Sequence, residues 1–170
     1  SGTGKTTAAE ALVSQMRPSG SGTVPLYRVN VAALVSKYIG ETAKNFETVF
    51  RAGEAMGAAL IFDEAEGLFA RRTGNVKDSN DKHSNAELGF LLQCLEAYSG
   101  IAILTTNMRS AIDDAFFRRL RFAIELPFPD RVQRLAIWHR VLPDALPRAA
   151  LDFDALARVS LAGGNIRSVA

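Results

Sequence analysis

The chain opens with the stretch Ser1-Gly2-Thr3-Gly4-Lys5-Thr6-Thr7. It matches the second half of the phosphate-binding motif G-x-x-x-x-G-K-[ST], whose first glycine would precede Ser1. Gly2 and Gly4 let the backbone approach phosphate oxygens without a Cβ atom in the way, and successive N–H groups then form an anion-binding concavity. A bare G-K-T also occurs in ordinary glycine-rich turns, so this interpretation depends on finding a second half of the site further along the chain.

The motif assigns a role to each side chain that follows its glycines. The helix expected to begin near Lys5 would add unpaired N–H groups and the positive end of its dipole. Lys5 would reach the β- and γ-phosphates of a nucleotide, and the Thr6 hydroxyl would ligate Mg²⁺. The strand that delivers such a loop would precede Ser1, so we expect the sequence to be part of a longer protein.

The composition excludes several other classes of protein. The chain has 170 residues, of which 48% are hydrophobic and 22% charged, as in one ordinary soluble domain. A net charge of +2 is too weak to indicate a nucleic-acid partner. No apolar run is long enough to span a bilayer. The single cysteine, Cys94, rules out an internal disulfide framework and fits a reducing cytoplasm.

Short apolar segments alternate with helical patterns over most of the chain. The expected strands are Leu26–Val31, Ala58–Phe62, Ile101–Leu104 and Phe122–Leu126. Apolar residues on one face predict a helix over Thr42–Met56, and the capping box Ser84-Asn85-Ala86-Glu87 predicts the start of another. This alternation predicts a parallel, doubly wound α/β domain over residues 1–129. From Asp130, an expected N-cap, only helical patterns follow, which predicts a small helical subdomain over residues 130–170.

Carboxylates at a strand end supply the second half of the site. Ligands of open α/β sheets bind at the carboxyl ends of strands, and Asp63 and Glu64 follow the run Ala58–Phe62. Because strand neighbours point to opposite sides, the two carboxylates can take two roles. We expect Asp63 to hold Mg²⁺ through water and Glu64 to activate the attacking water as a general base.

Polar residues after the next two apolar runs extend this interpretation. Asn107 follows Ile101–Leu104 and could orient water against the γ-phosphate without competing for the metal. Arginines at 118, 119 and 121 lie between apolar residues, and their planar guanidinium groups suit phosphate. They have no obvious path to the chain's own nucleotide, so we expect Arg118 or Arg121 to act on a neighbouring subunit's, as an arginine finger supplied in trans.

In this order and spacing, the motifs resemble those of the AAA family of P-loop ATPases. The matching segments are Ser1–Thr6 to Walker A, Leu60–Ala65 to Walker B, Thr106-Asn107 to sensor 1, Arg118 and Arg121 to the arginine fingers, and Gly163–Asn165 to the sensor 2 segment. The resemblance implies a strand order of 5-1-4-3-2 with strand 1 missing, and a ring, usually hexameric, with Mg²⁺-ATP between subunits. The nucleotide would be held by Gly2, Thr3, Gly4, Lys5, Thr6 and Thr7.

One further segment bears on the substrate. Tyr38-Ile39-Gly40 resembles the first pore loop of AAA protein translocases, where an aromatic ring grips an extended chain by apolar contact. A core tyrosine in a turn is the alternative. Lys77–His83 would fall near a second, more polar pore loop.

The resemblance implies a cytoplasmic ATPase that remodels or threads a protein substrate or assembly. The pore and finger segments are most similar to bacterial AAA proteins, including those that accompany contractile injection systems. Two alternatives remain. A nucleic-acid motor or loader on the same core would need a basic stripe and several aromatic residues in its pore loops. A nucleotide-dependent scaffold with little hydrolysis would have no need of Glu64.

Overall fold

The structure is a computed structural model that describes residues 2–16, 22–35, 40–69, 79–109, 112, 114–143 and 151–170. It divides into two compact units. The larger unit is Thr6–Ala123, and the smaller one joins Ser1–Lys5 to Ile124–Ala170.

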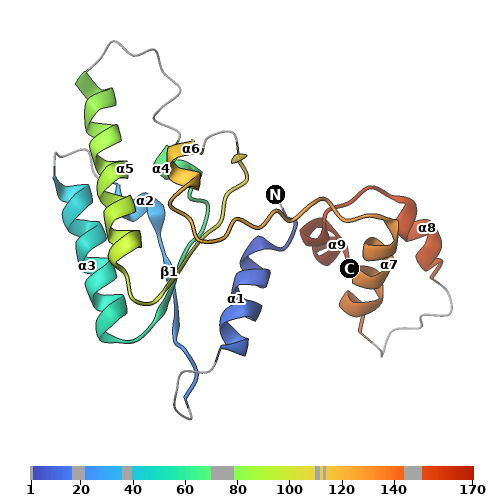
Figure 1. Cartoon of the computed structure of the whole chain (residues 1–170). Helices are drawn as coiled ribbons and strands as arrows, with labels where there is room; N and C mark the ends of the chain where they lie inside the picture. The colour runs from blue at the N-terminus through green and yellow to red at the C-terminus, as the bar shows by residue number, and fades with distance from the viewer. Residues whose placement is uncertain are drawn as a thin grey trace. The chain divides into compact units, whose positions relative to one another are not determined.

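A parallel sheet forms the centre of the larger unit (Figure 1). Its strands are β1 (Leu26–Val29), β2 (Ala59–Phe62) and β3 (Ile101–Leu104), in the order β1-β2-β3. All four residues of β2 are buried, as the continuous apolar run predicts for a central parallel strand. The expected α/β fold with a parallel sheet is therefore confirmed.

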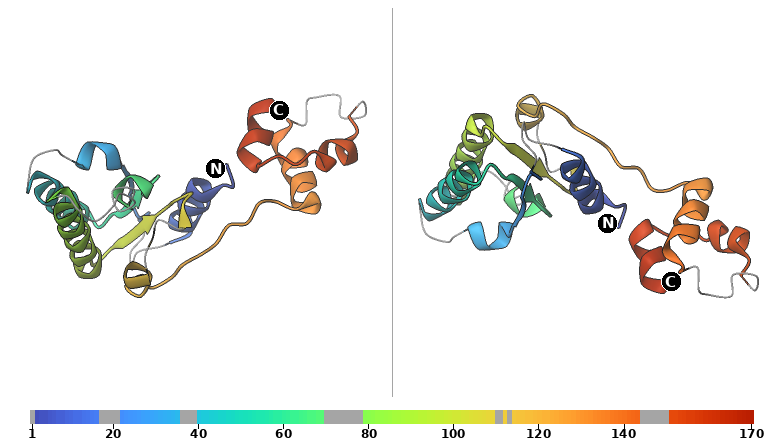
Figure 2. Two further views of the ribbon diagram at one scale, coloured as in Figure 1. Left: turned by 90° about the horizontal axis from the view of Figure 1, so that it is seen from above. Right: turned by 90° about the horizontal axis from the view of Figure 1, so that it is seen from below.

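Helices cover both faces of this sheet. The helices of this unit are α1 (Lys5–Gln15), α2 (Val31–Leu34), α3 (Glu41–Ala55), α4 (Glu66–Phe69), α5 (Ser79–Ala97) and α6 (Asp114–Phe117). Figures 1 and 2 show α3 and α5 side by side on one face of the sheet, with α1 on the opposite face. Parallel strands joined through helices bring their carboxyl ends to one edge, where the polar residues collect.

The apolar face predicted for α3 packs against β2. Phe46 and Phe62 are fully buried, and Phe50 stacks on Phe62 with their ring centroids 5.5 Å apart. Removing such an aromatic side chain from a core costs about 3–5 kcal/mol. Gly53 also lies on this face, and a Cβ atom there would meet the Tyr98 hydroxyl at 2.6 Å. That hydroxyl donates a hydrogen bond to the Ala58 carbonyl oxygen at 2.8 Å, so it has little freedom to move away.

Two predictions for individual elements are wrong. Helix α5 begins at Ser79, five residues before the predicted capping box at Ser84, because extending a helix costs far less than starting one and Asp81 favours its first turn. Phe122–Leu126 forms no strand, and Phe122 and Ile124 are 85% and 80% exposed. A strand requires a partner backbone, and β3 pairs only with β2 among the described strands.

The smaller unit contains three helices, α7 (Arg131–Val141), α8 (Phe153–Arg158) and α9 (Gly163–Val169). Asp130 is the predicted N-cap: it accepts a hydrogen bond from the Gln133 N–H at 2.7 Å, and the Gln133 side chain completes a capping box. Trp138, Leu142 and Ile166 form the core of the unit. Nothing in the described ranges of either unit is a helix both long and apolar enough to cross a membrane.

Candidate functional site

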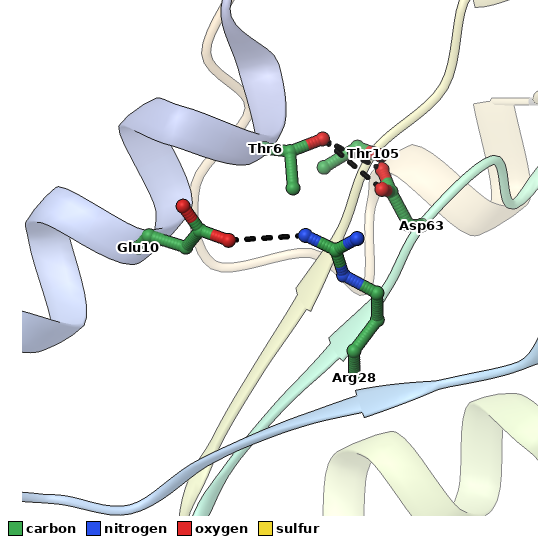
Figure 3. A network of polar contacts seen from close by, with 5 residues as sticks. All are labelled: Thr6, Glu10, Arg28, Asp63 and Thr105. Atoms are coloured by element: carbon green, nitrogen blue, oxygen red, sulfur yellow. Dashed lines mark hydrogen bonds and ion pairs between the residues drawn. The ribbon is translucent and has the colours of Figure 1, made fainter.

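Asp63 is the centre of the polar network at the carboxyl end of β2 (Figure 3). The Thr6 hydroxyl oxygen lies 3.0 Å from Asp63 Oδ1 and 3.1 Å from Oδ2, and donates to this carboxylate. Thr6 belongs to the first turn of α1, while Asp63 directly follows β2. The fold therefore brings together the two side chains that the sequence predicts as metal ligands.

The chemistry of this pair fits Mg²⁺. A threonine hydroxyl and a carboxylate are hard oxygen donors, which this cation prefers. Mg²⁺ in nucleotide sites is usually bound by one or two protein oxygens, and takes its remaining ligands from phosphates and water. Thr6 and Asp63 are therefore a sufficient protein contribution to such a site.

The glycines before α1 give the loop its shape. Gly2 and Gly4 have φ values of 78° and 87°, in the left-handed region that favours glycine. A Cβ atom at Gly4 would meet nothing within 4 Å, so this position faces open space. Lys5 Nζ donates to Thr3 Oγ1 at 3.3 Å, a contact within the loop itself. Helix α1 begins at Lys5, where the motif predicts the start of a helix.

The start of α9 approaches this loop within the smaller unit. The Gly164 N–H donates to the Gly2 carbonyl oxygen at 2.7 Å. A Cβ atom built on Gly164 would lie 3.0 Å from Gly2 Cα, tighter than most real contacts. The predicted sensor 2 segment, Gly163–Asn165, thus lies against the predicted phosphate loop, and only glycine at 164 permits the approach as it stands.

Glu64 lies in a turn and not at the end of a strand. Strand β2 ends at Phe62, and residues 63–65 form a turn in which Glu64 has a φ of 55°. The expectation that Asp63 and Glu64 diverge because they alternate along a strand is wrong. They occupy a turn in which Glu64 adopts a left-handed backbone conformation, and the Glu64 side chain is exposed.

Asn107 contacts a carboxylate that the sequence interpretation missed. Its side-chain Nδ2 donates to Glu66 Oε1 at 3.1 Å, and its backbone N–H donates to Glu66 Oε2 at 3.4 Å. Partial burial raises the pKa of Glu66, but hydrogen bonds from its own backbone, from Asn107 and from Thr106 outweigh this and lower the pKa below the usual 4.5. Only the third acidic letter in Asp63-Glu64-Ala65-Glu66 could have pointed to this residue.

The three arginines differ in their surroundings. Arg119 Nε lies 3.3 Å from Glu96 Oε1, an exposed ion pair that ties the segment after α6 to α5. Arg118 and Arg121, the predicted finger residues, are both exposed. The remaining network in Figure 3 is a second exposed pair, Arg28 Nη2 to Glu10 Oε1 at 3.0 Å, which joins β1 to α1. Exposed pairs of this kind stabilise a fold by about 1 kcal/mol at most.

The predicted pore loop lies largely outside the described residues. Tyr38 and Ile39 are among the residues not described, while Gly40 caps α3 with a φ of 80°. The predicted second pore loop, Lys77–His83, is described only from Ser79, where it is the first part of α5 and not a loop.

Comparison with known proteins agrees with this geometry. The chain is 30% identical over 159 residues to an AAA ATPase forming ring-shaped complexes from Corynebacterium efficiens, covering 88% of this chain and 30% of that protein. It is 29% identical over 175 residues to ATP-dependent zinc metalloprotease FtsH 3 of Sphaerobacter thermophilus, with 98% and 34% covered. It is 30% identical over 177 residues to the proteasome-activating nucleotidase of Archaeoglobus fulgidus, with 99% and 43% covered.

The chain thus spans from 30% to 43% of the length of these three relatives. A sequence model of one family, described as the ATPase family associated with various cellular activities (AAA), matches residues 1–130. That match includes the loop at Gly2–Thr7, the Asp63 network and Asn107. The chain belongs to the AAA family.

Proposed function

We propose that this chain is the nucleotide-hydrolysing part of an oligomeric AAA ATPase that remodels or threads a protein substrate or assembly. The observation that carries the proposal is the contact between Thr6 and Asp63, at 3.0 and 3.1 Å. It joins the first turn of α1 to the carboxyl end of β2, which are the two places where a P-loop enzyme holds Mg²⁺. Residues 1–129 would form the nucleotide-binding core, and residues 130–170 part of a helical lid.

In this mechanism each residue has one role toward Mg²⁺-ATP. The N–H groups from Gly2 to Thr7 and the Lys5 ammonium group hold the phosphates, while Thr6 and Asp63 hold the metal. Mg²⁺ would supply charge neutralisation on the β- and γ-oxygens. Glu64 accepts a proton from water as the water oxygen attacks the γ-phosphorus, and Asn107 orients that water. The bond to the β-phosphate oxygen breaks, and ADP leaves with its electron pair.

The proposal includes an oligomer, because the arginine side chains need a partner. Arg118 and Arg121 are exposed, and a guanidinium group supplied by a neighbouring subunit typically raises the rate of phosphoryl transfer by ~10³–10⁵. The Corynebacterium efficiens relative is named as forming ring-shaped complexes, which supports a ring here, usually of six subunits in this family.

A protein substrate is favoured over nucleic acid. The names of two relatives refer to proteolysis, a metalloprotease and a proteasome-activating nucleotidase. Tyr38-Ile39-Gly40 supplies one aromatic and one aliphatic side chain suited to gripping an extended polypeptide, whereas a nucleic-acid motor would need several aromatic residues. The likeness of these segments to AAA proteins of contractile injection systems supports a narrower proposal, that the substrate is a protein assembly of that kind.

The direct test is Lys5→Ala in the full-length protein. Losing the ammonium group should abolish measurable ATP binding in calorimetry and phosphate release. Lys44→Ala, which removes an exposed lysine from α3, is the matched control and should bind as the wild type does. An unchanged affinity in Lys5→Ala would exclude the phosphate-loop assignment. Light scattering with and without ATP tests the oligomer in the same samples.

A further inference from the structure

Thr105 links both carboxylates of the proposed site, although it belongs to none of the motifs. We infer that Thr105 is a positioning residue whose hydroxyl group orients Asp63 toward the metal and fixes the backbone that carries Glu64. This inference rests on the proposed function and adds to it the residue that holds its metal ligand and its general base in place together.

The hydroxyl group of Thr105 is used from both sides. A threonine hydroxyl has one proton to donate and two lone pairs to accept with. The Thr105 proton goes to Asp63 Oδ1 over an oxygen-to-oxygen distance of 2.5 Å. A lone pair accepts the Glu64 N–H at 3.3 Å. One oxygen atom therefore bridges a side chain and a peptide group that are adjacent in the sequence.

The backbone of Thr105 makes this bridge rigid. Its N–H donates to the Phe62 carbonyl oxygen at 3.0 Å, and its carbonyl oxygen accepts the Ala65 N–H at 2.8 Å. These two bonds clamp Thr105 to both ends of the turn at residues 63–65. Thr105 is only 6% exposed, so water has little access to replace its hydroxyl group. The end of β3 is thus attached to the turn after β2 by four hydrogen bonds of a single residue.

This attachment sets the geometry of the metal ligand. Thr105 holds Asp63 Oδ1 from one direction, while the Thr6 hydroxyl approaches both carboxylate oxygens from another (Figure 3). The two hydroxyl groups fix the plane of the carboxylate before any cation arrives. Hydrogen bonds that orient a metal ligand typically change metal affinity or activity by about 10–100-fold.

The same attachment sets the backbone of Glu64. A residue other than glycine rarely adopts a φ of 55°, and such conformations persist where surrounding contacts hold them. The hydrogen bond from the Glu64 N–H to Thr105 Oγ1 is a contact of this kind. Removing the hydroxyl group would therefore disturb both the metal ligand and the base, and leave the phosphate loop unchanged.

The experiment compares Thr105→Val and Thr105→Ser in the full-length protein. Valine keeps the shape and loses the hydroxyl group, whereas serine keeps the hydroxyl group. Thr48→Val is the matched control, because the Thr48 hydroxyl donates only to the Lys44 carbonyl oxygen on the exposed surface of α3. Three quantities are measured: the Mg²⁺ concentration for half-maximal hydrolysis, kcat, and ATP affinity by calorimetry with Mg²⁺ and with EDTA.

Thr105→Val should raise the half-maximal Mg²⁺ concentration about 10-fold and lower kcat by a similar factor. Its ATP affinity in EDTA should equal that of the wild type, and Thr105→Ser should recover most of both losses. A valine variant with normal Mg²⁺ dependence, or with equal losses of ATP affinity in EDTA and in Mg²⁺, would overturn the inference. If Thr105→Val does not fold, Thr105→Cys replaces it, because a thiol is a weak donor and acceptor and should shift the Mg²⁺ requirement the same way.

The same measurements separate this inference from the proposed function. Full-length wild-type protein that neither binds nor hydrolyses ATP would exclude the proposed function itself. An active wild type whose Thr105→Val variant is indistinguishable from it would leave the function standing and exclude only the role of Thr105.

Discussion

Glu66 holds Asn107 by two atoms at once: its carboxylate oxygens accept the Asn107 side-chain amide at 3.1 Å and the Asn107 backbone N–H at 3.4 Å. The contact joins α4 to the segment after β3 and fixes which end of the Asn107 amide faces α4. A residue proposed to orient water is thereby itself oriented by a carboxylate that takes no part in the proposed chemistry.

The Glu66–Asn107 contact should make part of the stability depend on pH. Burial raises the pKa of Glu66, but its hydrogen bonds lower it below 4.5 overall. A carboxylate with a depressed pKa in the folded state stabilises the fold above its unfolded pKa, and this contribution is lost as the pH falls through the folded value. Glu66→Gln should therefore lower the free energy of unfolding at pH 7 by about 1 kcal/mol, with a smaller difference below pH 4.

Urea unfolding at several pH values measures that difference. Asn107→Ala provides the control, because without its partner Glu66 loses much of its advantage as a charged group. In the Asn107→Ala background, the Glu66→Gln difference should be nearly independent of pH. A difference between wild type and Glu66→Gln that grows on acidification would contradict the sign predicted here.

Glu64→Gln should separate ATP binding from hydrolysis. Glutamine keeps the size of the side chain but cannot accept a proton, so turnover should fall by about 10²–10⁴-fold while ATP affinity stays near that of the wild type. Glu47→Gln, on the exposed surface of α3, is the control and should hydrolyse ATP normally. Single-turnover phosphate release and calorimetry measure the two quantities, and near-normal turnover would remove Glu64 from the role of base.

Local patterns predicted the elements that depend on local causes. The apolar face of α3, the buried run of β2 and the capping residue Asp130 each follow from a few neighbouring residues, and the structure confirms all three. The strand expected at Phe122–Leu126 needs a backbone to pair with, which no pattern within the segment can reveal. Its apolar residues carry the signal of a strand without the means to form one.

The site shows the same division. Gly2, Lys5, Thr6 and Asp63 belong to motifs with a known spacing, so the sequence could predict that they act together. Thr105 and Glu66 act through contacts with residues 42 and 41 positions away, at Asp63 and Asn107. Those contacts depend on the order of strands in the sheet, and no periodicity in the sequence encodes it. The roles of Tyr38 and of the arginines stay predictions.

The arginine fingers can be tested by mixing subunits. One population carries Arg118→Ala with Arg121→Ala, and the other carries Glu64→Gln. Each population alone should hydrolyse little ATP. Mixed rings contain sites with an intact Glu64 beside a neighbour with intact arginines, so part of the activity should return. Arg119→Ala is the control, because Arg119 pairs with Glu96 of its own chain. Mixtures no more active than their components would argue against fingers supplied in trans.

The approach of α9 to the phosphate loop makes Gly164 the position where helix stability and nucleotide binding should diverge. Alanine favours a helix over glycine by about 1 kcal/mol, so Gly164→Ala should strengthen α9 considered alone. Its Cβ atom, however, would lie 3.0 Å from Gly2 Cα, and backbone cannot rotate away as a flexible side chain could. The loop must shift, and we expect ATP affinity to fall roughly 10-fold, since small displacements of positioned groups are costly.

Gly89→Ala is the matched control for that substitution. Gly89 also lies within a helix, α5, and a Cβ atom there would meet nothing within 4 Å. It should gain the same helix stabilisation, seen as a higher unfolding temperature, with no change in ATP affinity. If Gly164→Ala binds ATP as tightly as Gly89→Ala, the hydrogen bond from the Gly164 N–H to the Gly2 carbonyl oxygen is not kept when the loop holds phosphate, and α9 does not constrain the loop during binding.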